Sequence, residues 1–385
     1  MYVKATKKIA EKLVSFADSL EFYNKFSEDV TEQLSDTNSV TLDIETNNID
    51  DIVRQYQEDH SKLNPKLKDF EKAKIAYLIH SAINDLSDLD AYPESFIEKV
   101  LDNGMIIPED TFDNDEILKI YQELLKNDGA FGNLNLLEMI IQKNNLVNCD
   151  LPTLPRPFWY VPTPTFGFIQ KQMYYPILVL EDEEIAYGLD PFDILSHRHY
   201  VERAHGNVLA LGLNLGYFVG SASSLETVSK VTVVDHHHDL IESFKTLVLP
   251  KLEHKEKIEI IETNEIEYLK QVQDGDYDYI FNDLKPKFSD LKLYIQVKEL
   301  VHGFKKSVIE HYFEEDFAFD LERYVINVIM KAQSESAGVY DNDMSSIEHL
   351  EVYEKIQKLL SKAKIKEPED IGYYLNAKNI IKLVS

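Results

Sequence analysis

The chain has 385 residues, 44% of them hydrophobic, which is enough for more than one domain with its own core. Its 68 acidic residues outnumber the 40 basic ones and give a formal net charge of -28, which disfavours nucleic acid as a partner because phosphate backbones bind basic surfaces. The single cysteine, Cys149, cannot form an internal disulfide, and without a signal peptide or an apolar run of membrane-spanning length we expect an acidic cytoplasmic protein that does not contact a membrane.

Residues 1–148 are predicted to form a helical domain. Apolar side chains recur at helical spacing from Ile9 to Leu20 and again from Ile75 to Ile83. Further apolar segments are separated by clusters of Gly, Pro, Asp and Asn, and they show little of the alternation that is typical of strands. Packing in a core and exposure on a surface explain the residues of this region, and none of them predicts a catalytic or binding site.

Residues 149–206 are predicted to form a linker and a β-hairpin. The segment 151–166 is rich in proline, which removes backbone donors and disfavours helix in the preceding residue. Aromatic and β-branched residues at 174–180, followed by the acidic residues 181–183, predict the hairpin and its turn. A short helix is expected at 193–204. We expect the hairpin to complete the edge of the sheet that follows.

Residues 207–337 alternate between strand and helix patterns. The predicted strands are short, apolar and β-branched: Val208–Leu211, Val231–Asp235, Ile258–Glu262, Tyr277–Leu284 and Ser307–Phe313. Helices are predicted between them, at Tyr217–Glu226, His238–Val248, Asn264–Gln273 and Leu291–His302. This order predicts an α/β domain of Rossmann-like fold, with a mostly parallel, doubly wound sheet buried on both faces. Residues 338–385 are expected to form a helical C-terminal tail.

The loop LGLNLGYF, residues 211–218, lies between the first predicted strand and the first helix. Gly212 and Gly216 let the backbone turn sharply and approach a ligand closely. Asn214 stands where a further glycine would usually lie, and asparagine tolerates the left-handed backbone region. Asp235 ends the next strand, as expected of a carboxylate that accepts hydrogen bonds from both ribose hydroxyl groups. Together these features predict a nucleotide-type site.

The runs VLALGLNLGYF, VTVVD, KIEIIETNEIEYL and YDYIFNDL resemble the successive cofactor motifs of class I S-adenosylmethionine-dependent methyltransferases. They are most similar to bacterial methyltransferase-like proteins related to spermidine synthase. A dinucleotide is a poorer fit, because the spacing Gly-x-Gly-x-x-Gly is not met. The resemblance covers the hairpin and the predicted sheet. It implies a class I methyltransferase domain with S-adenosylmethionine as its cofactor.

The residues that the resemblance places at the cofactor share the carboxyl edge of the predicted sheet: Gly212, Asn214, Gly216, Tyr217, Asp235, His236, Asn264 and Glu265. The glycine loop is implied to approach the methionine part of the cofactor and Asp235 to hold the ribose. Asn264 and Glu265 are implied to lie beside the adenine. Asp283, at the end of the fourth strand, is expected to face the amino group or the substrate, and it is the catalytic candidate.

Two positions depart from the family pattern. Ala210 replaces an acidic residue before the first glycine, and Asn264 replaces an aspartate. Each change removes a charged acceptor, whose hydrogen bond contributes about 1.5 to 3 kcal/mol. Three functions remain open: methyl transfer to a small molecule or a protein, a catalytically degenerate methyltransferase-fold scaffold, and aminopropyl transfer of the spermidine synthase type. The sequence defines neither the methyl acceptor nor the oligomeric state.

The histidines near the loop allow two further interpretations. The run His236–His238 suggests a metal site, but consecutive side chains point in different directions and a helical site needs ligands at i and i+4. We therefore predict no metal site there, and a contact between His236 and the cofactor. The general-base candidates by residue type are His197, His199, Tyr200 and His205, since histidine titrates near neutral pH, and a polar helix face accounts for them as well.

Overall fold

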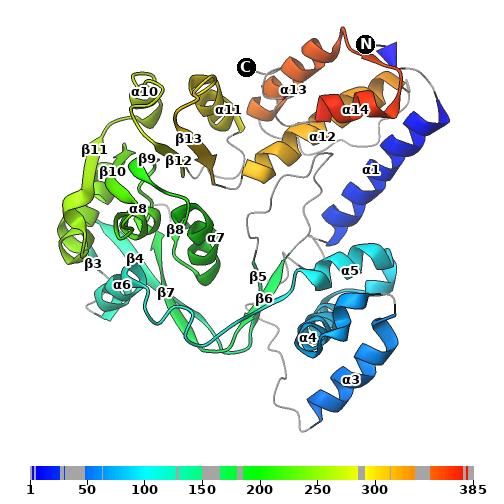
Figure 1. Cartoon of the computed structure of the whole chain (residues 1–385), viewed down its shortest axis with the longest axis horizontal. Helices are drawn as coiled ribbons and strands as arrows, with labels where there is room; N and C mark the ends of the chain where they lie inside the picture. The colour runs from blue at the N-terminus through cyan, green and yellow to red at the C-terminus, as the bar shows by residue number, and fades with distance from the viewer. Residues whose placement is uncertain are drawn as a thin grey trace. The chain divides into compact units, whose positions relative to one another are not determined.

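The computed structural model of the chain describes residues 2–3, 6–26, 30, 48–62, 64–126, 130–149, 165–179, 185–284, 291–312, 314–333, 347–375 and 379. These residues divide into two compact units. Figure 1 labels their helices and strands. The first unit takes the described residues of Met1–Ser19 and His197–Ser385. The second takes those of Leu20–Leu151 and Thr163–Ser196. The predicted boundaries at residues 148, 206 and 337 stay predictions.

A five-stranded parallel sheet forms the centre of the first unit, with the order β11-β10-β9-β12-β13. Its strands are β9 (Gly206–Leu211), β10 (Val228–Asp235), β11 (Ile258–Glu262), β12 (Tyr279–Asn282) and β13 (Val308–His311). The sequence predicted all of these strands and their parallel direction. Because β10 and β11 lie on one side of β9 while β12 and β13 lie on the other, the order of the chain reverses between β9 and β12. The fold of this sheet is therefore Rossmann-like.

Helices cover both faces of the parallel sheet, as predicted (Figure 1). They are α8 (Tyr217–Ser223), α9 (His238–Ser243) with a π-helical continuation at Phe244–Val248, α10 (Glu265–Leu269) and α11 (Leu291–Leu300). On one face Leu209 and Ile280 pack in a buried cluster with Val297 of α11. On the other face the ring of Phe218, from α8, lies 4.2 Å from the ring of Phe281. Successive strand residues thus alternate between two apolar layers.

The C-terminal part of the first unit is mostly helical, and the prediction of a helical tail at 338–385 stays a prediction. It contains α12 (Glu314–Gln333), α13 (Ile347–Leu360) and α14 (Pro368–Leu375). The short strand β14 (Lys364–Ile365) pairs in parallel with β1 (Tyr2–Val3). Two helices have residues in both units, α1 (Lys7–Phe26) and α7 (Pro191–Val201), and α7 is the helix predicted at 193–204. None of the described helices has the length and apolar character needed to cross a membrane.

The second unit combines helices with two small sheets. Its helices are α3 (Ile49–His60), α4 (Phe70–Leu86), α5 (Glu94–Asp102) and α6 (Glu116–Lys126). Its strands are β2 (Met105–Ile107), β3 (Ala130–Phe131), β4 (Leu134–Ile141), β5 (Leu146–Asn148), β6 (Phe166–Ile169), β7 (Met173–Val179) and β8 (Ile185–Gly188). Short 3-10 turns occur at Pro65–Lys68, Leu89–Ala91, Leu249–Lys251 and Lys255–Lys257 across the two units. The strand orders of the sheets are β2-β6-β5 and β3-β4-β7-β8.

The prediction that residues 1–148 are all helical is therefore wrong. Strand β4 pairs antiparallel with β7 from Asn135 to Ile141, and these hydrogen bonds to a distant segment outweigh the weak local pattern. Strand β7 also pairs antiparallel with β8, while the turn predicted at 181–183 lies outside the described residues. The expectation that this hairpin completes the parallel sheet is wrong as well, because among the described strands it belongs to a separate sheet.

Candidate functional site

The glycine loop, residues 212–216, begins where β9 ends. Gly212, Asn214 and Gly216 have positive φ angles of 95°, 49° and 73°. The left-handed backbone predicted for Asn214 is thus confirmed. At Gly212 space excludes a side chain as well, because an added Cβ would lie 2.7 Å from the main-chain oxygen of Asp283. At Gly212 the loop therefore places bare backbone against the end of β12.

The loop is tied to the end of β12 by a side chain. Nδ2 of Asn214 donates a hydrogen bond of 2.9 Å to the main-chain oxygen of Asp283. The two residues follow β9 and β12, the neighbouring strands between which the chain order reverses. Ligands of open α/β sheets bind at such a reversal, outside the carboxyl ends of the strands. The structure thus brings together the predicted loop and the predicted catalytic residue at the place where a ligand is expected.

The Asp283 side chain is buried, and among the described residues one of its two carboxylate oxygens has a hydrogen-bond partner. Its Oδ2 atom lies 3.1 Å from Nε2 of His197, and the two side chains are each 4% exposed. The imidazole of His197 stacks on the ring of Tyr312 at 4.3 Å between centroids, which fixes its plane. Oδ1 of Asp283 has no hydrogen-bond partner among the described residues. A buried oxygen without a donor costs about 1 to 3 kcal/mol, so this atom is suited to accept from a ligand.

Asp235 anchors the glycine loop from the side of β10. The carboxylate is 2% exposed, and its Oδ2 accepts a hydrogen bond of 2.8 Å from the main-chain N–H of Leu213. Its Oδ1 accepts from the N–H of His237 at 2.8 Å and lies 2.8 Å from Nδ1 of the same residue. Burial alone would raise the pKa of Asp235, but these hydrogen bonds outweigh it and hold the pKa below its ordinary value. The bond to Asp235 in turn raises the pKa of His237.

His236 pairs with a second buried carboxylate. Nδ1 of His236 lies 2.8 Å from Oε1 of Glu265, a side chain at the start of α10 that is 5% exposed. The rings of His236 and His237 lie 3.9 Å apart between centroids, tilted by 36°. The prediction that consecutive histidine side chains point apart is wrong for this pair. Both imidazoles turn toward neighbouring buried carboxylates, because those acceptors need donors.

Two predicted cofactor residues have local structural roles. Asn264 is exposed, and its Oδ1 caps helix α10 by accepting a hydrogen bond of 3.1 Å from the N–H of Glu267. The sequence contains the signal for this, since an asparagine with a glutamate three residues later is typical of a helix start. Tyr217 is 6% exposed, and its ring lies 5.8 Å from that of His197. Their contacts with a cofactor stay predictions.

Sequence reasoning missed a buried polar cluster at the end of β13. Nδ1 of His311 lies 3.0 Å from Nδ2 of Asn282, and His311 is 2% exposed. Burial, assisted by the charge of Lys298, lowers the pKa of His311 to about 3, so the ring is neutral at physiological pH. Lys298 and Tyr294 both contact Oε1 of Glu314, at 2.5 and 2.7 Å. A histidine inside a strand pattern gives no local signal of such a cluster.

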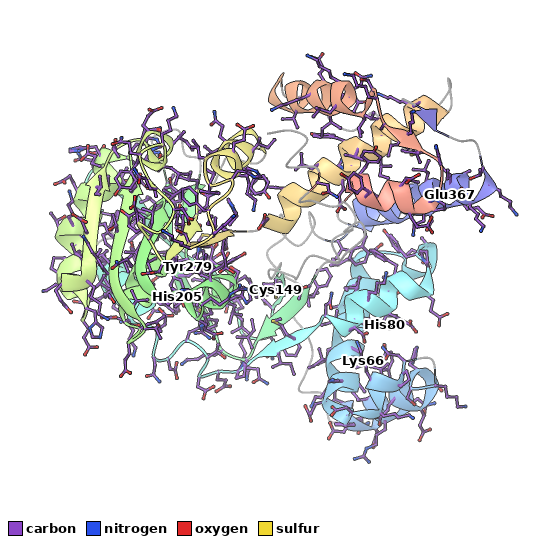
Figure 2. The ribbon with its side chains drawn as sticks, turned by 45° about the horizontal axis from the view of Figure 1, so that its top comes forward. Lys66, His80, Cys149, His205, Tyr279 and Glu367 are labelled. Atoms are coloured by element: carbon purple, nitrogen blue, oxygen red, sulfur yellow. The ribbon has the colours of Figure 1, made fainter. Side chains whose placement is uncertain are left out.

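Two of the three histidines among the general-base candidates lie away from the loop. His205 is exposed and precedes β9, and its ring lies 6.0 Å from that of Tyr279, at the start of β12 (Figure 2). His199 contacts the side chain of Arg203, with 3.3 Å between Nε2 and the guanidinium nitrogen. Only His197, through Asp283, belongs to the carboxyl edge of the sheet.

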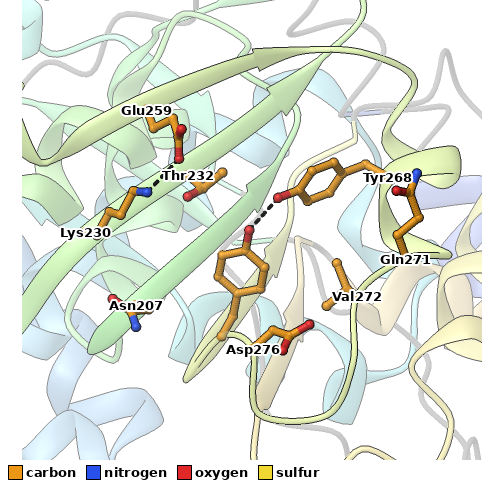
Figure 3. A pocket seen from close by; sticks show the side chains of 9 residues that line it. Asn207, Lys230, Thr232, Glu259, Tyr268, Gln271, Val272 and Asp276 are labelled. Carbon is orange, nitrogen blue, oxygen red and sulfur yellow. Dashed lines mark hydrogen bonds and ion pairs between the residues drawn. The ribbon is translucent and has the colours of Figure 1, made fainter.

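A pocket of about 420 Å³ lies at the opposite, amino-terminal half of the same sheet (Figure 3). Its lining is largely polar: Asn207, Lys230, Thr232, Glu259, Tyr268, Gln271, Val272, Asp276 and Tyr277. The hydroxyls of Tyr268 and Tyr277 are 2.6 Å apart, and Lys230 pairs with Glu259 at 2.6 Å. None of the predicted cofactor residues lines this pocket.

Comparisons with known proteins give partial structural similarity only. No protein-family profile and no curated protein sequence matches the chain. Among solved structures, the spermidine synthase of Thermotoga maritima is 15% identical over 38% of this chain and 57% of that chain, with a TM-score of 0.28. An SAH-bound methyltransferase of Podospora anserina is 14% identical over 51% of this chain and 68% of that chain, with a TM-score of 0.27. The chain thus spans little more than half the length of the spermidine synthase.

Proposed function

We propose that the carboxyl edge of the parallel sheet binds an S-adenosyl nucleoside, and that the chain transfers the methyl group of S-adenosylmethionine to a small molecule or a protein. The observation that carries the proposal is the meeting of the glycine loop with Asp283 where the strand order reverses. One further feature fits such a ligand: Oδ1 of Asp283 lacks a donor among the described residues.

In this proposal each residue has a positioning task. The glycine loop presents backbone to the methionine part, and Asp235 holds the loop through Leu213 while offering the remaining lone pair of its Oδ2 to the ribose. Asp283 accepts from the amino group of the cofactor or from a donor on the substrate. His197 orients Asp283. S-adenosylmethionine supplies an already activated methyl group, so orientation accounts for most of the rate and a strong base is not required.

A second candidate is a scaffold that keeps the fold without the chemistry. Both oxygens of the Asp235 carboxylate already accept from protein donors, and the side chain is 3% exposed. With Ala210 and Asn264 in place of acids, this satisfied carboxylate favours a site that has lost its ligand. Aminopropyl transfer is the third candidate, and a titration with three ligands separates it from methyl transfer.

The experiment is a calorimetric titration of the full chain with S-adenosylmethionine, its demethylated product SAH and its decarboxylated analogue. Methyl transfer predicts that the two ligands with a carboxylate bind and that the decarboxylated analogue binds more weakly. A preference for the decarboxylated analogue would support aminopropyl transfer. Absence of binding for all three, in a chain shown by circular dichroism to be folded, would leave the scaffold.

A further inference from the structure

A set of four ionisable side chains lies next to the glycine loop in the first unit. Asp235, at the end of β10, and Glu265, at the start of α10, are both buried, with 2% and 4% exposure. Nδ1 of His237 lies 2.8 Å from Oδ1 of Asp235, and Nδ1 of His236 lies 2.8 Å from Oε1 of Glu265. The ligand atoms of Asp235, His236 and His237 all lie within 4.8 Å of one another.

We propose that Asp235, His236, His237 and Glu265 form a binding site for a divalent transition-metal ion of the Zn²⁺ type. Two imidazole nitrogens with two carboxylate oxygens are a ligand set that such ions prefer, whereas Mg²⁺ and Ca²⁺ favour oxygen alone. Zinc bonds of about 2.0 to 2.2 Å place neighbouring ligand atoms of a tetrahedral site about 3.3 Å apart. The His236–Glu265 and His237–Asp235 contacts are 2.8 Å, and the ligand atoms of Asp235, His236 and His237 lie within 4.8 Å of one another, so these three draw closer around an ion that Glu265 joins through His236.

The charge of the set also fits a cation. Among the described residues, no lysine or arginine forms an ion pair with either carboxylate, and the basic side chains in contact with them are the two imidazoles. Two neighbouring buried carboxylates are costly unless a cation compensates them. A divalent ion would take the place of the imidazole nitrogens beside the carboxylates as their positive partner, and any proton it displaces from an imidazolium would leave to solvent.

The set has an approach from solvent and ordered supports. The side chains of His236 and His237 are 51% and 46% exposed, so an ion can reach them without unfolding of the site. Asp235 is held by the N–H of Leu213, and Glu265 lies in the first turn of a helix whose start is capped by Asn264. Such outer contacts fix the orientation of metal ligands.

This inference goes beyond the proposed function, although Asp235 takes part in both. The metal titration is therefore performed without any nucleoside. The full chain, freed of metal with a chelator, is titrated with Zn²⁺ in competition with a chromogenic chelator, and with Co²⁺ while its visible absorption is followed. We expect one ion per chain and a Co²⁺ spectrum typical of tetrahedral coordination.

The variants separate this site from ordinary surface histidines. His237→Ala and Glu265→Gln are each expected to weaken Zn²⁺ binding about tenfold or more. His238→Ala is the matched control, because His238 is the next residue, is exposed, and contacts Glu262 at 3.0 Å outside the set. The His238→Ala variant should bind Zn²⁺ with the same affinity as the unchanged chain. Circular dichroism verifies the fold of each variant.

Two results would overturn the inference. One is the absence of stoichiometric Zn²⁺ binding to the folded chain, and the other is an equal loss of affinity in His238→Ala and His237→Ala. If Glu265→Gln does not fold, His236→Ala replaces it, since that side chain is half exposed. Zn²⁺ binding in a chain that binds no nucleoside would leave this site standing and count against the proposed function alone.

Discussion

The side-chain amide of Asn214 donates a hydrogen bond of 2.9 Å to the main-chain oxygen of Asp283. The bond joins the loops that follow β9 and β12, where the strand order reverses. A glycine at this position would adopt the left-handed backbone but would supply no donor. Asn214 therefore combines tolerance of a φ angle of 49° with a tie between the two strand ends.

Replacing Asn214 separates these two roles. Asn214→Gly keeps the backbone and removes the donor, so we expect a loss of about 1 to 2 kcal/mol in the free energy of unfolding. Asn214→Val adds the cost of a β-branched residue at positive φ, about 1 to 2 kcal/mol more. Urea unfolding measures both. Equal stability of the two variants would show that the loop does not have the left-handed conformation.

A pair of glycines tests the close approach of the loop to Asp283. Gly212 and Gly303 have φ angles of 95° and 94°, but a Cβ at Gly212 meets the Asp283 oxygen at 2.7 Å while one at Gly303 meets nothing within 4 Å. Alanine at either position should cost about 1 to 2 kcal/mol for the backbone. Gly212→Ala should cost about 1 to 3 kcal/mol more, because the strand ends must move apart. Indistinguishable urea midpoints for the two variants would refute this account.

The parallel sheet was predictable because buried parallel strands have a local signature of short β-branched runs between helices. The left-handed backbone at Asn214 was predictable because few residue types adopt it. Strand β4 could not be predicted from local sequence, since its ladder is formed with β7, which comes later in the chain. The close approach of the His236 and His237 rings could not be predicted either, because it depends on Glu265, which is 29 residues from His236.

The pair His197 and Asp283 is open to a double-mutant cycle. His197→Phe keeps an aromatic ring against Tyr312 but leaves Oδ2 of Asp283 buried without its hydrogen-bond partner, which should cost about 1 to 3 kcal/mol. Asp283→Asn removes the charge, and in the double variant part of the loss should be recovered, with a coupling of about 0.5 to 3 kcal/mol. Strictly additive losses in chemical denaturation would mean that the two side chains do not interact.

The stability of the first unit should depend on pH through Asp235 and His237. Because the pKa of Asp235 is lowered in the fold, this carboxylate stabilises the fold at pH values above the ordinary aspartate pKa. This contribution is lost as the pH falls through the lowered pKa. Because the pKa of His237 is raised in the fold, this imidazole stabilises the fold at pH values below the ordinary histidine pKa. This contribution is lost as the pH rises through the raised pKa. His237→Ala should therefore reduce the free energy of unfolding more at about pH 5.5 than at about pH 9. A pH-independent difference from the unchanged chain would argue against the pair.

Binding of SAH to the full chain tests the central claim most directly. Isothermal titration should show a single site with a dissociation constant between about 10 µM and 1 mM, equivalent to about 4 to 7 kcal/mol, since Ala210 and Asn264 stand where the methyltransferase motifs that the sequence resembles have acids. Gly212→Ala should abolish this binding, whereas Gly303→Ala should leave it unchanged. Absence of heat at millimolar SAH, with a folded chain, or equal binding by both variants, would contradict the claim that the glycine loop is a nucleoside site.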